Sequence, residues 1–274
     1  MWHWFRDYRR KKIVAAPFPS EWEGYIQNNI QYYQYLNNLE KKRLRDLIQI
    51  FIAEKSWLGC NGLELTDEIR VIIAAQACLL ILALPKDYYR NVKSIYVYPT
   101  TILSPEDPIG FFEVSLGPSG GGPMPILGEA HHRGPVILVW DAVKRDTRHP
   151  ERGHNLVYHE FAHKLDMLDD SADGTPPLTT PEEYKRWIEV CSKEYLGLCD
   201  KVERSKATFL DSYAATNEAE FFSVATEVFF SKPEKMKSHH PKLYQVLQDF
   251  YRQNPAQKVF SHQQSNRSAS PSES

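Results

Sequence analysis

The stretch His159-Glu160-Phe161-Ala162-His163 has the pattern H-E-x-x-H within a periodically apolar run. Two histidines at positions i and i+4 of a helix lie one turn apart on the same face, so their imidazole nitrogens can bind one metal ion. The glutamate between them lies beside that ion, where it can take a proton from a bound water. The pattern indicates a zinc-dependent hydrolase, although so short a motif also arises by chance.

The residues around the motif predict a helix over about residues 154–168 with one buried face. Its apolar stripe consists of Val157, Phe161, Leu165 and Leu168. The two histidines, Glu160 and Asp166 fall largely off this stripe, so we expect them to face a cleft.

The composition is that of an ordinary globular protein, with 274 residues, 42% hydrophobic residues and a net charge of -2. This charge gives no reason to expect direct binding to nucleic acid. The four cysteines form no C-x-x-C pair and no signal peptide precedes them, which predicts free thiols and a cytoplasmic protein. The apolar run from Val71 to Leu84 is too short for a transmembrane segment. It predicts a buried helix, capped by Thr66 and stopped by Pro85.

The order of the elements predicts an α+β fold that is mainly helical with a small mixed β-sheet. We expect a basic and aromatic arm at residues 1–16, which is solvated or touches a membrane surface or an acidic partner, and a disordered tail at 256–274. Between them lies a single domain at 17–255, with helices within 20–58 and at 66–84, 181–197, 216–231 and 240–252. It divides into a helical layer at about 17–90, the sheet and motif helix at about 91–170, and a helical part at about 181–255. Strands are expected at residues 94–98, 111–116 and 135–140.

A catalytic zinc ion needs a third protein ligand, and the apolar helix at residues 216–231 offers one. Its only polar stripe contains Thr216, Glu220, Ser223 and Glu227. A carboxylate on a buried helix needs a cation or hydrogen bonds to offset its desolvation, so Glu220 is our candidate ligand and Glu227 a partner for a ligand histidine. Glu218 is the alternative ligand. Glu220 could instead close a capping box that starts at Asn217, and Glu227 could pair with a nearby Lys or Arg.

Other residues are weaker candidates on spacing alone. Asp166 could hydrogen-bond a ligand imidazole or be a surface acid. Tyr213 could donate a hydrogen bond to an oxyanion, although most tyrosines serve packing. The histidine pairs 131–132 and 239–240 are interpreted as loop residues. An extra ligand such as Glu113 or His131 is left open.

From about residue 17 to 255 the chain resembles a known family, the Mlc titration factor A family of zinc metallopeptidases. The resemblance is carried by Gly153-His154-Asn155, which leads into the motif and on to Asp166, and by two further segments. These are Gly134-Pro135-Val136-Ile137-Leu138-Val139-Trp140-Asp141 and Tyr213-Ala214-Ala215-Thr216-Asn217-Glu218-Ala219-Glu220-Phe221-Phe222. It implies a gluzincin-like zincin core similar to that of the anthrax lethal factor protease domain.

The resemblance also implies roles and partners. It implies that His159, His163 and Glu220 bind one zinc ion, that Glu160 is the general base and that Tyr213 is an active-site tyrosine. It implies an aminopeptidase-like enzyme acting on peptides, and binding of a transcriptional repressor that controls glucose uptake. The alternative is a protein that mainly sequesters the repressor, with peptidase activity secondary.

Overall fold

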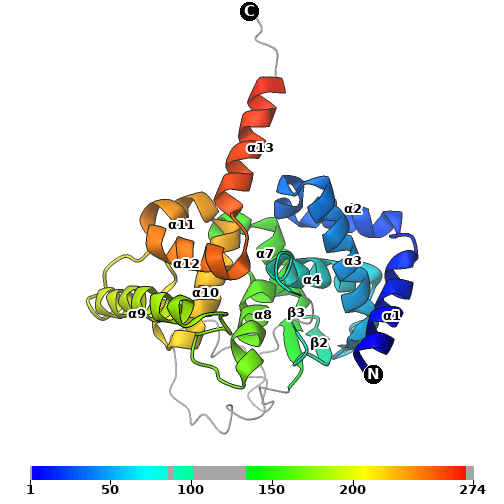
Figure 1. Cartoon of the computed structure of the whole chain (residues 1–274), viewed down its shortest axis with the longest axis horizontal. Helices are drawn as coiled ribbons and strands as arrows, with labels where there is room; N and C mark the ends of the chain where they lie inside the picture. Colours follow the sequence, from blue (N-terminus) through cyan, green and yellow to red (C-terminus); the bar gives the residue numbers. More distant parts are fainter. Residues whose placement is uncertain (1, 86–88, 101–133, 270–274) are drawn as a thin grey trace, which may run out of the picture.

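The computed structural model describes residues 2–85, 89–100 and 134–269. These residues form a mainly helical protein around a three-stranded sheet. In Figure 1 the first helices lie to the right and the later helices to the left, with α8 and the sheet between them. The expected strand at 111–116, Glu113 and the pair His131-His132 lie outside the described residues.

The N-terminal layer contains several elements where the sequence led us to expect helix over much of residues 20–58. They are α2 (Ser20–Asn29), the 3-10 helix η1 (Gln31–Tyr35), α3 (Asn38–Glu54) and β1 (Ser56–Gly59). The break before α3 is a capping box: the Asn37 side chain accepts from the Glu40 backbone N–H, and Glu40 accepts from the Asn37 N–H, each at 3.0 Å. This exchange satisfies backbone donors at a helix start.

The sheet has the order β1-β2-β3, with β2 at Ser94–Tyr98 and β3 at Val136–Val139. Both pairings are parallel; Trp57 lies opposite Ile95, and Val97 opposite Leu138. A parallel pair needs a crossover, and α4 (Asp67–Leu80) lies within the one that joins β1 to β2. The small sheet is as expected, but the strands in the described part of the chain are all parallel rather than mixed.

Three helices carry the core and position the motif: α4, α8 (Leu156–Asp166) and α10 (Glu218–Ser231). Thr66 caps α4 as predicted, since its Oγ1 accepts from the Ile69 N–H, and nearly all of α4 is buried. Of the predicted α8 stripe, Val157, Phe161 and Leu165 are fully buried. Leu168 is half-buried and lies past the helix end, in η4 (Met167–Asp169).

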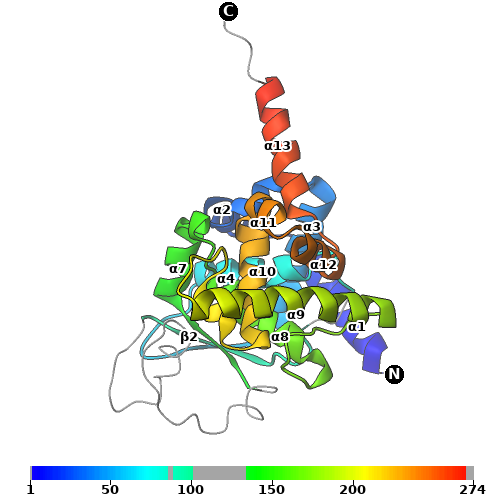
Figure 2. The same cartoon turned by 90° about the vertical axis from the view of Figure 1, so that its left-hand side faces the viewer.

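The remaining elements surround this core. Between β3 and α8 lie α7 (Trp140–Arg148) and η3 (Pro150–Arg152), and after α8 come α9 (Pro181–Glu203), η5 (Ser212–Ala215), α11 (Pro233–His239) and α12 (Pro241–Tyr251). Figure 2 shows the long helix α9 running across the molecule in front of α8 and α10. No helix in the described ranges combines the length and apolarity needed to cross a bilayer.

The two ends of the chain are more ordered than the sequence suggested. The basic arm is helix α1 (Trp2–Ala15), held on α3 by an ion pair of 2.7 Å between Arg10 and Glu54. Most of the tail expected to be disordered forms α13 (Pro255–Ala269), which projects from the body (Figure 1). Asn254 caps it by accepting from the Gln257 N–H, and Ala256 is buried in the core. The pair Asn254-Pro255 is a helix-start signal within a run of polar residues.

Candidate metal centre

The two motif histidines converge on one point, as a spacing of four residues on a helix requires. Both lie on α8, and the Nε2 atoms of His159 and His163 are 3.2 Å apart. His159 is buried, and the helix that carries both is fixed by Asn155, whose side chain accepts from the Tyr158 N–H at 2.9 Å. The pair therefore presents two nitrogen atoms from a rigid element.

Glu220 of α10 brings a carboxylate oxygen to the same point. Its Oε2 lies 3.0 Å from His159 Nε2 and 3.3 Å from His163 Nε2. Asn217 does cap this helix, but it uses the backbone N–H of Glu220 and leaves the Glu220 side chain turned toward the histidines. Glu218 is exposed in the first turn. The structure thus brings Glu220, and not Glu218, to the histidines.

The three atoms fit the ligand set of a tetrahedral metal ion. Bonds of about 2 Å in a tetrahedral zinc site place neighbouring ligand atoms roughly 3.3 Å apart, close to the 3.0–3.3 Å separations here. Glu220 Oε2 is buried and makes no well-formed hydrogen bond. Within the described residues these three form the one group of His, Cys, Asp or Glu side chains suited to a metal. Two nitrogen donors and one carboxylate are a donor set that zinc accepts.

The charges around this point favour a cation. Burial opposes ionisation of Glu220, but the imidazoles of His159 and His163 hold its pKa well below the ordinary value. Burial would lower the pKa of His159, yet the carboxylates of Glu220 and Glu227 raise it well above the usual range. The carboxylates thus stabilise positive charge here, and a divalent cation would supply that charge.

Glu227 holds His159 from the side away from Glu220. Its Oε1 lies 2.8 Å from His159 Nδ1, and its Oε2 accepts from the Asn155 N–H at 2.5 Å. A histidine that binds metal through Nε2 carries its proton on Nδ1, so this contact fixes both tautomer and ring orientation. The Asn155 side chain in turn donates to Gln76 Oε1 at 2.6 Å.

Glu160 and Tyr213 lie beside the three candidate ligands. Burial raises the pKa of Glu160, and the neighbouring His159 and His163 act against that rise. Tyr213 lies in η5, directly before α10, with its ring centroid 6.1 Å from that of His159. A carboxyl group and a tyrosine ring therefore lie near the candidate ligands.

The partner of Asp166 is a backbone N–H of a loop and not a ligand imidazole. Its Oδ2 accepts from the Gly174 N–H at 2.9 Å, while its Oδ1 and His163 Nδ1 are both buried without a hydrogen-bond partner. Gly174 has φ +75°, and a Cβ there would lie 2.2 Å from the carbonyl oxygen of Glu218. Asp166 therefore fixes a loop that packs on the first turn of the Glu220 helix.

The sequence did not reveal Gln76, Asn155 or Gly174 as parts of this site. Asn155 had a detectable signal, because an Asn before an apolar helix is a capping residue. The pair 239–240 lies apart from the site: His240 Nδ1 is 2.8 Å from Glu194, and the ring of His239 stacks on Phe209.

Comparisons with known proteins agree with this geometry. The family described as glucose-regulated metallo-peptidase M90 matches residues 4–252. An uncharacterised protein of Synechocystis is 36% identical over 255 residues, covering 91% of this chain and 89% of that protein. Mlc titration factor A of Klebsiella pneumoniae is 31% identical over 261 residues, covering 94% and 93%. That of Serratia proteamaculans is 30% identical over 227 residues, covering 82% and 84%.

The fold and the cluster of two histidines and a glutamate are compatible with a metallopeptidase. The chain belongs to the M90 metallopeptidase family, which includes the Mlc titration factors A.

Proposed function

We propose that this protein is a zinc-dependent peptidase with aminopeptidase-like activity. The observation that carries the proposal is the convergence of three ligand atoms, from His159, His163 and Glu220, at the separations of a tetrahedral site. A zinc ion held there supplies a Lewis acid that activates water and polarises a carbonyl group.

The remaining chemistry falls to side chains of this chain. Glu160 accepts the proton of the attacking water on its carboxylate and passes it to the nitrogen of the leaving amine. Its raised pKa suits this role, because a carboxylate whose pKa is closer to neutral is a stronger base and takes the proton of the water more readily. The hydroxyl group of Tyr213 donates a hydrogen bond to the oxygen that becomes negative in the transition state.

A peptide substrate fits the edge strand of the sheet. In the described residues β3 pairs with β2 alone, and we propose that an extended peptide adds along its other edge. β3 runs directly into α7, which leads through η3 to α8. Strand addition would therefore hold an extended peptide in a fixed register near the motif helix.

The test is to compare Glu160→Gln with the wild type for zinc content and for hydrolysis of a peptide library. We expect Glu160→Gln to keep stoichiometric zinc and to lose hydrolysis by about a hundredfold or more, since a general base contributes roughly that factor. Glu182→Gln, an exposed acid in the first turn of α9, is the matched control and should retain full activity. A fully active Glu160→Gln variant would refute the assignment.

A second candidate function comes from the relatives called Mlc titration factor A. We propose that the chain also binds an Mlc-like transcriptional repressor and so influences expression of glucose-uptake genes. The four free cysteines fit a cytoplasmic location for this role. A pull-down with purified Mlc tests it: capture by both the wild type and His163→Ala identifies sequestration that does not need the metal, and no capture by the wild type removes this candidate.

A further inference from the structure

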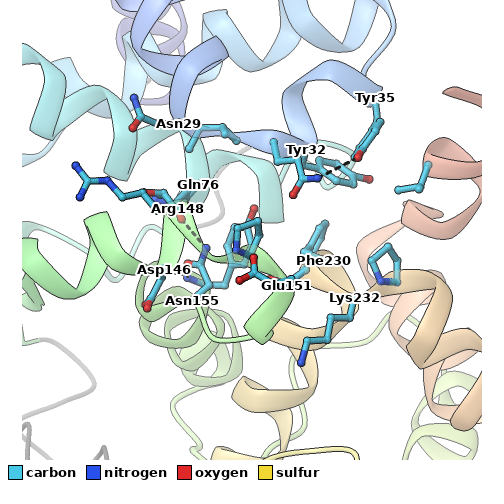
Figure 3. A pocket seen from close by; sticks show the side chains of 18 of the residues that line it. Asn29, Tyr32, Tyr35, Gln76, Asp146, Arg148, Glu151, Asn155, Phe230 and Lys232 are labelled. Atoms are coloured by element: carbon cyan, nitrogen blue, oxygen red, sulfur yellow. Dashed lines mark hydrogen bonds between the residues drawn. The ribbon is translucent and has the colours of Figure 1, made fainter. Parts of the chain in front are cut away.

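A large cavity, drawn in Figure 3, lies at the N-terminal end of α8, where Asn155 and Tyr158 line it. Its volume is about 620 Å³, within the range of small-molecule sites. Residues of η1, α7, α10, α11 and α13 line it, together with Gln76 of α4 and Asn155 of the α8 cap. The lining includes none of the three candidate ligands and none of Glu160, Tyr213 and Glu227, so the cavity is separate from the metal position.

Aromatic rings form one wall of the cavity. Tyr32 meets Phe230 with ring centroids 5.8 Å apart and Tyr35 with centroids 6.0 Å apart, both edge to face. Tyr158 lies 5.5 Å from Phe230 on the same side. Such rings pack on the flat apolar face of a ring-shaped ligand.

Hydrogen-bonding groups complete the lining. The Tyr32 hydroxyl is buried and has no partner among the described residues, although a buried hydroxyl normally has one. The side-chain amides of Gln76 and Asn155 also reach this space, joined to each other by the bond drawn in Figure 3. Neighbouring atoms cover this hydroxyl, and a ligand oxygen atom that displaced them would supply its missing partner.

The positive and negative charges that line the cavity are equal in number. Three are cationic and three anionic: Arg148, Lys232, Lys235, Asp146, Glu151 and Glu234. The lining therefore carries no net charge that would select an ion, and an uncharged ligand suits it better.

The cavity is connected to the metal centre through hydrogen bonds. Gln76 and Asn155 line the cavity, Asn155 donates its backbone N–H to Glu227, and Glu227 contacts Nδ1 of His159. A ligand that moved the Asn155 segment would change the position of Glu227. Since Glu227 orients His159, binding in the cavity would alter the metal site.

We propose that this cavity is an effector site for an uncharged, ring-shaped molecule that carries hydroxyl groups, and that its occupancy changes metal affinity through Asn155, Glu227 and His159. A sugar and a nucleoside share this chemistry. The coupling to the metal rests on the proposed zinc site, whereas ligand binding to the metal-free protein does not.

Calorimetric titration of the zinc-free protein with maltose, and separately with adenosine, tests the site. We expect saturable one-to-one binding of one probe at millimolar concentration. Tyr32→Phe keeps the ring packing and should weaken binding about tenfold, through loss of a buried hydrogen bond. Tyr25→Phe, in the neighbouring helix α2 and not part of the lining, is the control and should bind as the wild type does. No binding of either probe, or equal binding by Tyr32→Phe, overturns the site.

The same titration after loading with zinc tests the connection, with metal analysis to verify uptake. We expect the Kd of the probe to change about fivefold, because coupling between two sites is reciprocal. Glu227→Gln, loaded with zinc and verified by the same metal analysis, should show no such difference. A zinc-loaded wild type with an unchanged Kd refutes the connection; failure to take up zinc refutes the metal assignment and, with it, the connection.

Discussion

Gly174 packs directly against Glu218, so closely that a Cβ on Gly174 would lie 2.2 Å from the Glu218 carbonyl oxygen. The backbone of Gly174 also donates its N–H to Asp166, and its carbonyl oxygen accepts from Trp187 Nε1 at 3.1 Å. This glycine therefore joins the end of α8 to the start of α10, the two helices that carry the candidate ligands.

Replacing Gly174 with alanine should destabilise the protein by about 2 kcal/mol or more. The φ of +75° is unfavourable for alanine, and the new methyl group would push on the first turn of α10. Urea denaturation measures the change. Gly197→Ala is the control: Gly197 lies within α9 with no atom near a new Cβ, so the protein should gain about 0.5–1 kcal/mol. Equal stability of the two variants would contradict the packing.

Glu220→Gln should lower zinc affinity strongly, whereas Glu218→Gln should leave it unchanged. The carboxylate of Glu220 lies 3.0 Å from His159 Nε2, and Glu218 is exposed on the same turn. Zinc stabilises a protein that binds it only when folded, by about 2.7 kcal/mol at a hundredfold excess over Kd, and so raises its unfolding temperature. Thermal unfolding of each variant, once with zinc and once with a chelator, therefore measures how strongly it binds zinc. The opposite result would make Glu218 the ligand.

Asn155→Ala should cost about 1–2 kcal/mol of stability and also weaken zinc binding. The substitution removes the cap of α8 and the bond to Gln76, and so loosens the segment whose N–H contacts Glu227. Asn37→Ala removes a comparable cap from α3, far from the metal centre, and should cost stability alone. Competition with a chelating dye measures zinc affinity in both. Equal zinc affinity of the two variants would argue against a role for Asn155 at the metal centre.

Asp166 should make the zinc-free protein less stable as the pH rises. Burial raises the pKa of this carboxyl to about 7, while the Gly174 N–H opposes that rise. A pKa above the unfolded value near 3.9 means that the folded state favours the protonated form. The stabilisation of the folded state by protonated Asp166 is full below about pH 4 and is lost as the pH rises through about 7.

Unfolding midpoints of the zinc-free wild type and Asp166→Asn between pH 4 and 8 check this expectation. The asparagine variant can still accept from Gly174 but does not ionise, so its stability should fall less over this range. Parallel curves for the two proteins would rule out the assigned titration.

Local patterns in the sequence predicted the parts of the site that depend on one helix at a time. The spacing of His159 and His163, the stripe of Val157, Phe161 and Leu165, and the buried carboxylate of Glu220 all follow from a period of 3.6 residues. The helical fold with a small sheet followed from the same patterns.

Contacts between distant segments could not be found in this way. Gln76 and Asn155 are 79 positions apart, and neither has a periodic signal that refers to the other. The strand β1 has only four residues, which is too short to show alternation, so the sequence predicts helix there instead. Asp166 was considered as a partner of an imidazole, whereas its nearest donor is a backbone N–H in a loop without regular structure.

His159 and Glu220 belong to different helices, with the whole of α9 between them, and their side chains meet at 3.0 Å. An ion bound to both would act as a cross-link that closes a loop of roughly sixty residues, which disfavours the unfolded chain entropically. During synthesis this cross-link cannot form until α10 has emerged, long after the motif helix. Metal uptake would then mark the completion of the domain, and a chain that ends before α10 would hold at most two of the three ligands.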